Sequence, residues 1–232
     1  MAIIEYRIMG VPERREKYIL PMLSRLGLPE DIVSYDYKKT GNAMENAKRT
    51  WLKETDADFV CVFQDDLLLA HNIKSIINEC AEHFPKAVFS FYNPRIHPEE
   101  RTNETPYVRV VGYGLYGPAL LIPTYMIKPI FYWGDVVYGR DFPHDDTVIG
   151  FFCKTHNVDV MTTNPSIVQH LGHNDSMLGY NNKNKVSKVF EENVVVDIFK
   201  TSKCVNSKYI PNTEIKPQGG YPCGQLKRLS EI

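Results

Sequence analysis

The chain has 232 residues, of which 43% are apolar and 24% charged, as is typical of a soluble globular protein with one sizeable domain. The sequence lacks an apolar run of about 18 residues, so we expect no membrane insertion. Five cysteines are scattered and never spaced as Cys-x-x-Cys, which argues against a disulfide framework or a zinc knuckle. We therefore expect a cytoplasmic protein, in the host cytoplasm if it is viral.

The formal net charge of −1 hides an uneven distribution. Residues 181–232 carry nine Lys and Arg against five Asp and Glu, whereas residues 1–180 carry 18 against 23. A mildly basic tail can meet a polyanion, although a solvated lysine-rich surface has the same composition.

Apolar periodicity in the first 92 residues predicts alternating strands and helices. The expected strands cover residues 3–9, 32–37, 58–63 and 87–92, and the expected helices cover 13–26, 43–54 and 72–84. Pro21 should kink or delay the first of these helices. The alternation predicts an α/β fold with a mostly parallel sheet and flanking helices.

The second half departs from this alternation. Residues 93–106 indicate a surface loop, and the elements expected after it are strands at 107–112 and 118–122, a short helix near 124–132, a helix at 146–156 and strands at 158–162 and 166–170. The apolar stretch from Val194 to Phe199 is expected to pack back on the body. We expect a mixed sheet in a single domain with a C-terminal extension.

Two adjacent carboxylates, Asp65 and Asp66, directly follow the buried run Phe-Val-Cys-Val-Phe-Gln of residues 59–64. They should lie at the carboxyl edge of the sheet, where open α/β sheets bind ligands. Carboxylates there suit Mn²⁺ or Mg²⁺, and such a cation can neutralise a departing diphosphate. The alternative is that the acids cap the next helix or are solvated.

Two further motifs could carry chemistry. In His144-Asp145-Asp146, a carboxylate at a helix start can take a proton from an attacking hydroxyl, or one of the two acids simply acts as the N-cap. In Gln169-His170-Leu171-Gly172-His173, a strand-end imidazole suits Mn²⁺. His170 and His173 compete for that role, and a structural histidine is the alternative.

Glycines and cations suggest contacts with a ligand. The stretch from Gly112 to Gly117 allows close backbone approach but has no P-loop lysine, and it could equally form a β-turn. Four cations near the sheet edge could contact phosphates, or could simply be solvated: Arg14, Arg15, Lys48 and Arg49. Asp36, at a strand end, could accept hydrogen bonds from a ribose or base, or could be a turn residue.

The order of these motifs over roughly residues 3–173 resembles that of GT-A type nucleotide-sugar glycosyltransferases. Gln64-Asp65-Asp66 stands where that family has Asp-x-Asp, the stretch from Gly112 to Gly117 stands for its glycine loop, His144-Asp145-Asp146 for its x-Glu-Asp motif, and His170 for its late metal-binding histidine. Two residues depart from the family's pattern. Gln64 replaces the first acid of Asp-x-Asp, so the function of that motif would depend on Asp65 and Asp66, and Asp145 replaces the glutamate of x-Glu-Asp.

The resemblance implies a single Rossmann-like GT-A catalytic domain at residues 1–173. Its nucleotide-sugar half would cover 1–92 and its acceptor half 93–173, and residues 174–232 would form a basic extension that packs on the body.

The resemblance also implies a hexosyl- or pentosyltransferase that uses a nucleotide diphosphate sugar, with a UDP-sugar as first choice. Asp66 and His170 would bind Mn²⁺ or Mg²⁺, and Asp146, with Asp145 as second choice, would act as base in an inverting reaction. The residues expected to bind the nucleotide sugar are Asp65, Asp36, Arg14, Arg15, Lys48, Arg49, Gly114 and Tyr113.

The acceptor is inferred from the tail. Basic groups beside Tyr180, Tyr209 and Tyr221 suit a nucleic-acid backbone and an extruded base. The chain is similar to compact bacteriophage enzymes that glycosylate 5-hydroxymethylcytosine or 5-hydroxymethyluracil, so DNA is the leading acceptor. A cell-surface polysaccharide or a protein is the alternative acceptor, and a nucleotidyltransferase or a non-catalytic carbohydrate- or nucleic-acid-binding module is the alternative class.

Overall fold

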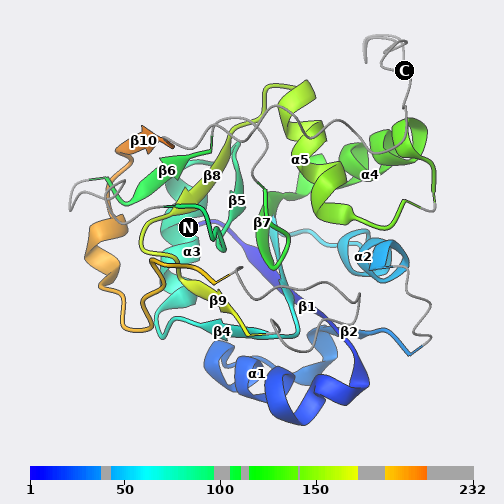
Figure 1. Ribbon diagram of the computed structural model, residues 1–232, viewed down its shortest axis with the longest axis horizontal. Coiled ribbons are helices and arrows are strands. Elements are labelled where there is room, and N and C mark those ends of the chain that lie inside the picture. The colour runs from blue at the N-terminus through cyan, green and yellow to red at the C-terminus, as the bar shows by residue number, and fades with distance from the viewer. Residues whose placement is uncertain (38–42, 97–104, 111–114, 141, 172–185, 208–232) are drawn as a thin grey trace.

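The computed structural model describes residues 1–37, 43–96, 105–110, 115–140, 142–171 and 186–207 (Figure 1). Their main feature is an eight-stranded sheet in the order β10-β6-β8-β5-β7-β3-β1-β2. Its strands are β1 (Ile4–Gly10), β2 (Val33–Tyr35), β3 (Phe59–Gln64), β5 (Val88–Ser90), β6 (Tyr107–Arg109), β7 (Ala119–Pro123), β8 (Val160–Thr163) and β10 (Cys204–Asn206). The sheet is mixed and mostly parallel, which confirms the predicted fold class.

Helices cover both faces of this sheet, as Figure 1 shows. They are α1 (Leu20–Leu26), α2 (Ala43–Trp51), α3 (Ile73–His83), α4 (Thr124–Tyr138) and α5 (Asp145–Thr155). In β3, Phe59, Cys61 and Phe63 join the core beneath α1 and α3, whereas Val60 and Val62 join the core beneath α2, α4 and α5. Successive side chains of a strand point to opposite faces, so a strand buried on both faces needs an unbroken apolar run.

The first predicted helix divides into shorter pieces. A 3₁₀ turn, η1 (Pro12–Arg14), is followed by a π-helical turn, η2 (Arg15–Ile19), and regular α1 starts only at Leu20. Pro21 then stands in the first turn of α1, where its missing N–H costs nothing. The predicted delay of the helix is therefore observed. A further 3₁₀ turn, η3 (Glu30–Ile32), leads into β2.

Strand order departs from the simple alternation in two places. β7 lies between β3 and β5 and is antiparallel to both, so β5 does not extend the parallel set of β2, β1 and β3. The last predicted strand, β9 (Val168–His170), is outside the main sheet and pairs with β4 (Leu67–Leu69), a strand that the periodicity did not predict. Separately, α4 continues past Pro129 to Tyr138 and is longer than expected.

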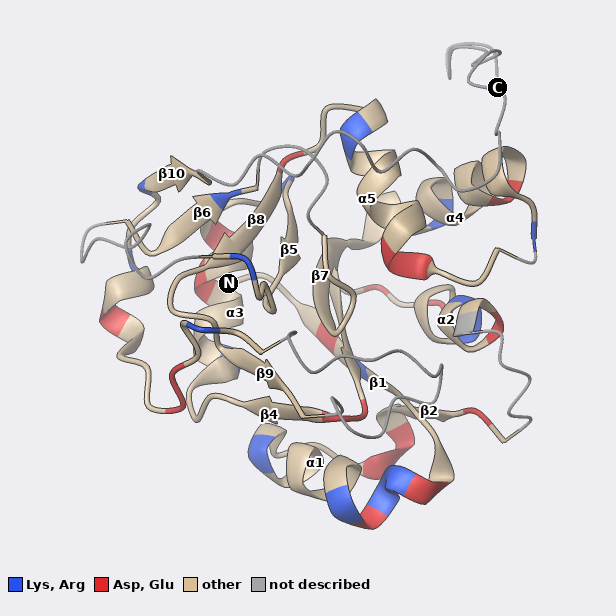
Figure 2. Ribbon diagram, viewed as in Figure 1, with Lys and Arg blue, Asp and Glu red and all other residues tan. Residues whose placement is uncertain are grey.

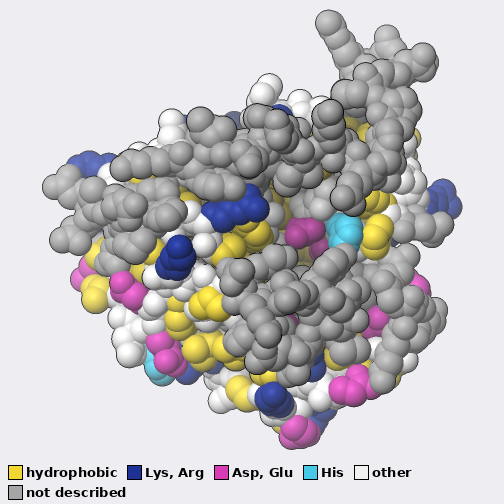
Figure 3. Space-filling model, in the orientation of Figure 1, with side chains coloured by type: hydrophobic (Ala, Val, Ile, Leu, Met, Phe, Trp, Pro, Cys, Tyr) yellow, Lys and Arg dark blue, Asp and Glu magenta, His cyan; other side chains and the backbone are white. Residues whose placement is uncertain are grey.

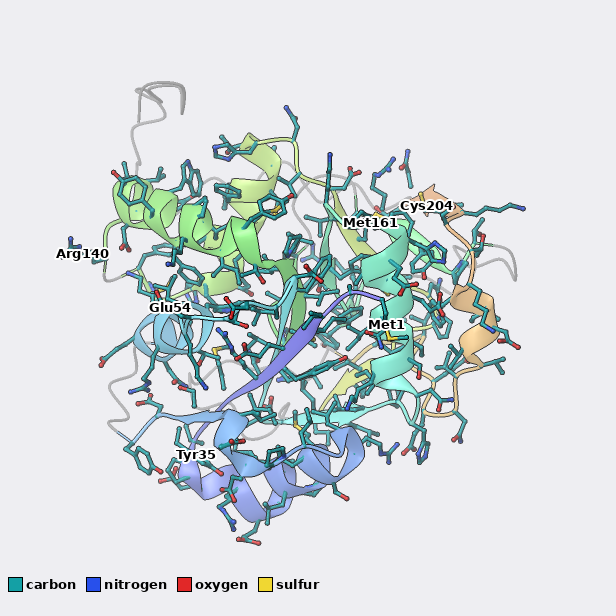
Figure 4. All side chains as sticks on the ribbon, turned by 180° about the vertical axis from the view of Figure 1, so that it is seen from behind. Met1, Tyr35, Glu54, Arg140, Met161 and Cys204 are labelled. Atoms are coloured by element: carbon teal, nitrogen blue, oxygen red, sulfur yellow. The ribbon has the colours of Figure 1, made fainter. Side chains whose placement is uncertain are left out.

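Residues 186–207 pack on the same body. The 3₁₀ turn η6 (Val196–Phe199) places Phe199 fully in the core, and the hydroxyl of Tyr107 donates to the carbonyl of Phe199 at 2.7 Å. β10 then joins the sheet beside β6. Figure 4 labels Tyr35 in β2 and Cys204 in β10, at opposite ends of the sheet. None of the helices in the described part of the chain has the length and apolarity to span a membrane.

Candidate active site

The carboxyl ends of β1, β2 and β3 meet at one edge of the sheet, because these three strands are parallel neighbours. Asp65 and Asp66 directly follow β3 at this edge, and their exposed fractions are only 6% and 4%. Figure 2 shows acidic residues both at the junction of β3 with β4 and at the start of α5. Two adjacent buried carboxylates require compensation by donors or positive charge.

Arg14, at the end of η1, supplies one compensating charge. Its Nη1 atom lies 2.7 Å from Oδ1 of Asp65 and 2.9 Å from Oδ2 of Asp66. The backbone N–H of Val11 donates to the other oxygen of Asp65 at 2.8 Å. The structure thus brings Arg14, which we predicted as a phosphate contact, directly onto the acid pair.

His170 reaches the same acid pair through the pairing of β4 with β9. Leu67 stands opposite His170 in that ladder, and the N–H of Leu171 donates to the carbonyl of Asp66 at 2.8 Å. As a result Nε2 of His170 lies 3.2 Å from Oδ2 of Asp66. Nδ1 of His170 is buried and has no hydrogen-bond partner among the described residues.

The two acids differ in their ionisation. Burial raises the pKa of Asp65 more than Arg14 lowers it. For Asp66, burial also acts to raise the pKa, but the hydrogen bond and charge of His170, together with Arg14, outweigh burial, and the pKa is lowered. Asp66 is therefore ionised at neutral pH and is the stronger candidate for holding a cation.

A divalent cation fits this site with few protein ligands. In the described segments, no group of three or more His, Cys, Asp and Glu side chains is arranged to hold a metal ion. Asp65 faces Val11 and Arg14, which leaves Asp66 and His170. Mg²⁺ commonly takes one or two carboxylates and completes its shell with substrate phosphates and water, and an imidazole beside a carboxylate suits Mn²⁺.

The charge balance supports this fit. Two carboxylates and one guanidinium leave a net charge of −1 when His170 is neutral, and all of these groups are largely buried. An uncompensated buried charge is costly, so the site favours an additional positive charge.

The second acid pair opens α5. His144 is the N-cap of this helix and makes no side-chain cap bond, so neither acid is the N-cap, contrary to our alternative interpretation. Asp145 is 7% exposed, and the indole N–H of Trp51 donates to its Oδ2 at 3.3 Å. Burial, reinforced by the charge of Asp146, raises the pKa of Asp145 to about 7.

Asp146 lies against Gly117, close to the first acid pair. A Cβ atom added to Gly117 would stand 3.0 Å from Cβ of Asp146, so a larger residue there would displace the carboxylate. The next residue, Pro118, accepts a hydrogen bond at 2.8 Å from the N–H of Gln64, which directly precedes Asp65. Both acid pairs therefore lie at the edge of the sheet where β3 ends.

Figure 3 shows acidic, histidine and apolar side chains next to one another on one face of the molecule.

The other predicted cations have partners in their own surroundings. Arg15 contacts Glu30 at 2.7 Å from its Nε atom, and Lys48 contacts Asp135. Arg49 donates to Oδ1 of Asn46 at 2.9 Å. None of these contacts brings Arg15, Lys48 or Arg49 to the acid pairs.

Asp36 does reach the sheet edge, since its N–H donates to the carbonyl of Gly10 at 2.8 Å. Tyr113, Gly114 and His173 lie outside the described residues.

Two aromatic residues near the acids, Trp51 and Tyr92, were not predicted as site residues. Trp51 binds Asp145, the ring of Tyr92 lies 5.8 Å from that of His170, and Tyr116 lies 6.1 Å from Tyr92. Tyr92 ends the fourth predicted strand, so the strand-end rule that identified Asp65 could have found it. Nothing local in the sequence indicates that Trp51 meets Asp145.

Comparisons with protein-family models and with curated protein sequences find no match. Solved glycosyltransferase structures are similar in outline. A mutant of Drosophila beta-1,4-galactosyltransferase 7, in complex with manganese, UDP-Gal and xylobiose, is 13% identical with a TM-score of 0.43, covering 83% of each chain. Residues 1–349 of S. aureus TarS are 12% identical with a TM-score of 0.47, covering 73% of this chain and 61% of that one.

A third structure, a glycosyltransferase involved in the glycosylation of the major capsid of PBCV-1, is 11% identical with a TM-score of 0.37, covering 78% of this chain and 98% of that one. At these levels of identity and overlap, the functional argument depends on the geometry of the site itself.

Proposed function

We propose that the protein is a metal-dependent glycosyltransferase that moves a sugar from a nucleotide diphosphate sugar, with UDP as the favoured nucleotide, to an acceptor hydroxyl. One observation carries this proposal. Nε2 of His170 lies 3.2 Å from Oδ2 of Asp66, at the sheet edge where Asp146 also lies. An ionised acid with an imidazole suits a cation, and a separate acid pair suits proton transfer.

Each side chain has a definite task in this scheme. Asp66 and His170 would hold Mn²⁺ or Mg²⁺, and the bound cation supplies charge neutralisation for the departing diphosphate. Asp146 would accept the proton of the acceptor hydroxyl while its oxygen attacks the anomeric carbon and the bond to the diphosphate breaks. Attack on the face opposite the leaving group inverts the anomeric configuration, through an oxocarbenium-like transition state.

The nucleotide would lie along the ends of β1 and β2. Asp36, whose backbone N–H donates to Gly10, would accept hydrogen bonds from a ribose or base. We retain Arg15, Lys48, Arg49, Tyr113 and Gly114 as proposed nucleotide-sugar contacts; the first two would have to leave their present acidic partners to serve.

For the acceptor we propose the hydroxymethyl group of a modified pyrimidine in DNA. The support is the excess of basic residues in 181–232, together with its aromatic residues. Transfer of labelled sugar to DNA containing 5-hydroxymethylcytosine or 5-hydroxymethyluracil, beside unmodified DNA, tests this acceptor. Label on a polysaccharide or protein and none on modified DNA would replace it.

The metal-dependent mechanism is tested with Asp66→Ala. We expect donor turnover to fall about 10³-fold, because metal stabilisation of the leaving diphosphate contributes several kcal/mol. Removal of the metal with EDTA should reduce the parent enzyme to a similar level. The matched control is Asp159→Ala, which removes a half-exposed acid that contacts Arg109 far from this edge.

Turnover by Asp66→Ala in metal-free buffer at the rate of the metal-loaded parent would refute the mechanism. Release of pyrophosphate in place of a nucleoside diphosphate would indicate a nucleotidyltransferase. Binding of UDP or nucleic acid without any turnover would indicate a binding module.

A further inference from the structure

Arg14 and His170 share a single oxygen atom of the acid pair. Oδ2 of Asp66 lies 2.9 Å from Nη1 of Arg14 and 3.2 Å from Nε2 of His170. The same Nη1 atom of Arg14 also lies 2.7 Å from Oδ1 of Asp65. One nitrogen therefore bridges two adjacent carboxylates, and it does so at the oxygen that faces the candidate imidazole ligand.

This arrangement is buried and electrostatically demanding. The side chain of Arg14 is 12% exposed, and those of Asp65 and Asp66 are 8% and 5% exposed. Without a positive charge between them, the two acids would face each other unscreened in a poorly hydrated place. Arg14 thus supplies the neutralisation that a divalent cation would otherwise supply.

Arg14 also has an aromatic neighbour beside the acids. The ring of Tyr18, one turn later in η2, lies 6.0 Å from Cζ of Arg14, and Lys17 lies over the same ring. An arginine that rotates about its side-chain torsions can exchange a carboxylate for an aromatic face or for an incoming phosphate. η1 follows β1 at the same sheet edge, so a diphosphate bound there would be within the same neighbourhood.

We propose that Arg14 is a built-in competitor of the divalent cation: it neutralises Asp65 and Asp66 while the donor is absent, and it moves from Asp66 to the donor's diphosphate when the cation binds. The consequence is ordered loading, in which the metal alone binds weakly and the metal with the nucleotide binds well. This inference deepens the proposed function and depends on its metal site.

The test is a titration of Mn²⁺ followed by the electron paramagnetic resonance signal of free Mn²⁺, with and without UDP. Without UDP, Arg14→Gln should bind Mn²⁺ at least about tenfold more tightly than the parent, because a unit positive charge next to the ion is gone. With UDP this advantage should vanish, since only the parent places a guanidinium on the diphosphate.

Two variants serve as controls. Arg109→Gln removes a half-exposed arginine of β6 that contacts Asp159, far from the acid pairs, and should match the parent in both titrations. Arg14→Lys keeps the charge and should bind Mn²⁺ within a few-fold of the parent without UDP.

Arg14→Gln leaves two buried acids without a cation, so its folding is measured as well. Its thermal midpoint should be low in EDTA and should rise with Mn²⁺ by more than that of the parent. If Mn²⁺ fails to stabilise the variant more than the parent, the proposal is wrong.

The remaining outcomes separate the two proposals. Equal Mn²⁺ affinity of the parent and Arg14→Gln without UDP would overturn the competitor role and leave the glycosyltransferase proposal intact. If neither protein binds Mn²⁺ with UDP present, both the competitor role and the proposed metal site are refuted.

Discussion

The same dipeptide, Asp-Asp, occurs twice at one edge of the sheet, in opposite surroundings. Asp65 and Asp66 are accompanied by a guanidinium and an imidazole. The donors to Asp145 are neutral, namely the indole of Trp51 and backbone N–H groups, and its neighbour Asp146 adds negative charge. The first pair follows the end of β3 and the second starts α5. Both positions are set by the local sequence, so the difference in their electrostatic surroundings comes from the residues that pack against them.

The comparison shows how packing divides the work between acids. Positive partners lower the pKa of Asp66 in spite of its burial, whereas burial without them raises the pKa of Asp145 to about 7. Titratable pairs whose environments separate their pKa values are a recurrent sign of divided acid and base roles. The first pair is suited to holding positive charge and the second to moving a proton.

The largest effect should come from removing the proposed base. Asp146→Asn keeps the size of the side chain but cannot accept the acceptor's proton, so transfer should fall about 10²- to 10⁴-fold. Binding of UDP with Mn²⁺, measured by calorimetry, should stay unchanged, because the first pair is intact. Asp197→Asn, an exposed acid in η6, is the control. If Asp146→Asn weakens metal binding as much as it slows transfer, the two pairs do not have separate roles.

A smaller effect should follow from displacing the base without removing it. In Gly117→Ala the new Cβ would stand 3.0 Å from Cβ and 3.4 Å from Oδ2 of Asp146, so the carboxylate must shift. The required shift is a few tenths of an ångström. We expect transfer to slow about tenfold, since misplacement of a reacting group by about 1 Å costs about 10²-fold.

The control for this variant is Gly150→Ala, in the same helix as Asp146, where the nearest atom would be Cβ of Leu115 at an ordinary 3.4 Å. It should keep its activity. Unchanged kinetics in both variants would show that the position of Asp146 is not critical.

Much of the fold could be predicted because it depends on local patterns. β3 is an unbroken apolar run because both of its faces are covered, and that pattern is visible in the sequence alone. The end of that run correctly placed Asp65 and Asp66 at the sheet edge. Pro21 likewise accounts for the late start of α1.

Pairing between distant segments could not be predicted in this way. The insertion of β7 between β3 and β5, and the pairing of β4 with β9, depend on contacts between distant parts of the chain that periodicity does not encode. The approach of His170 to Asp66 results from the second of these pairings. The contact of Trp51 with Asp145 and the contacts of Arg14 with the acids also join distant parts of the chain. Local sequence patterns therefore could not predict these pairings.

The most delicate test of the comparison uses stability as a function of pH. Asp145 has a folded-state pKa of about 7 against an ordinary 3.8, so the unfolded chain loses this proton first as pH rises. The parent should therefore lose stability from about pH 4 to about pH 7 through this group, by an amount on the order of a few kcal/mol. Asp145→Asn should not show this loss, because its side chain does not ionise.

The pKa shift of Asp66 has the opposite sign to that of Asp145, so Asp66→Asn is the second variant in this experiment. Its lowered folded-state pKa means that the parent gains stability as pH rises through the acidic range, and the variant should lack that gain. Urea unfolding at about pH 3, pH 5 and pH 8 measures both slopes: the Asp66 effect lies below pH 5, and most of the Asp145 effect lies between pH 5 and pH 8. The free energy of unfolding of Asp145→Asn minus that of the parent should be larger at pH 8 than at pH 5. Parallel pH profiles for the parent and Asp145→Asn would mean that Asp145 is charged in the folded protein, and the contrast between the two acid pairs would then be absent.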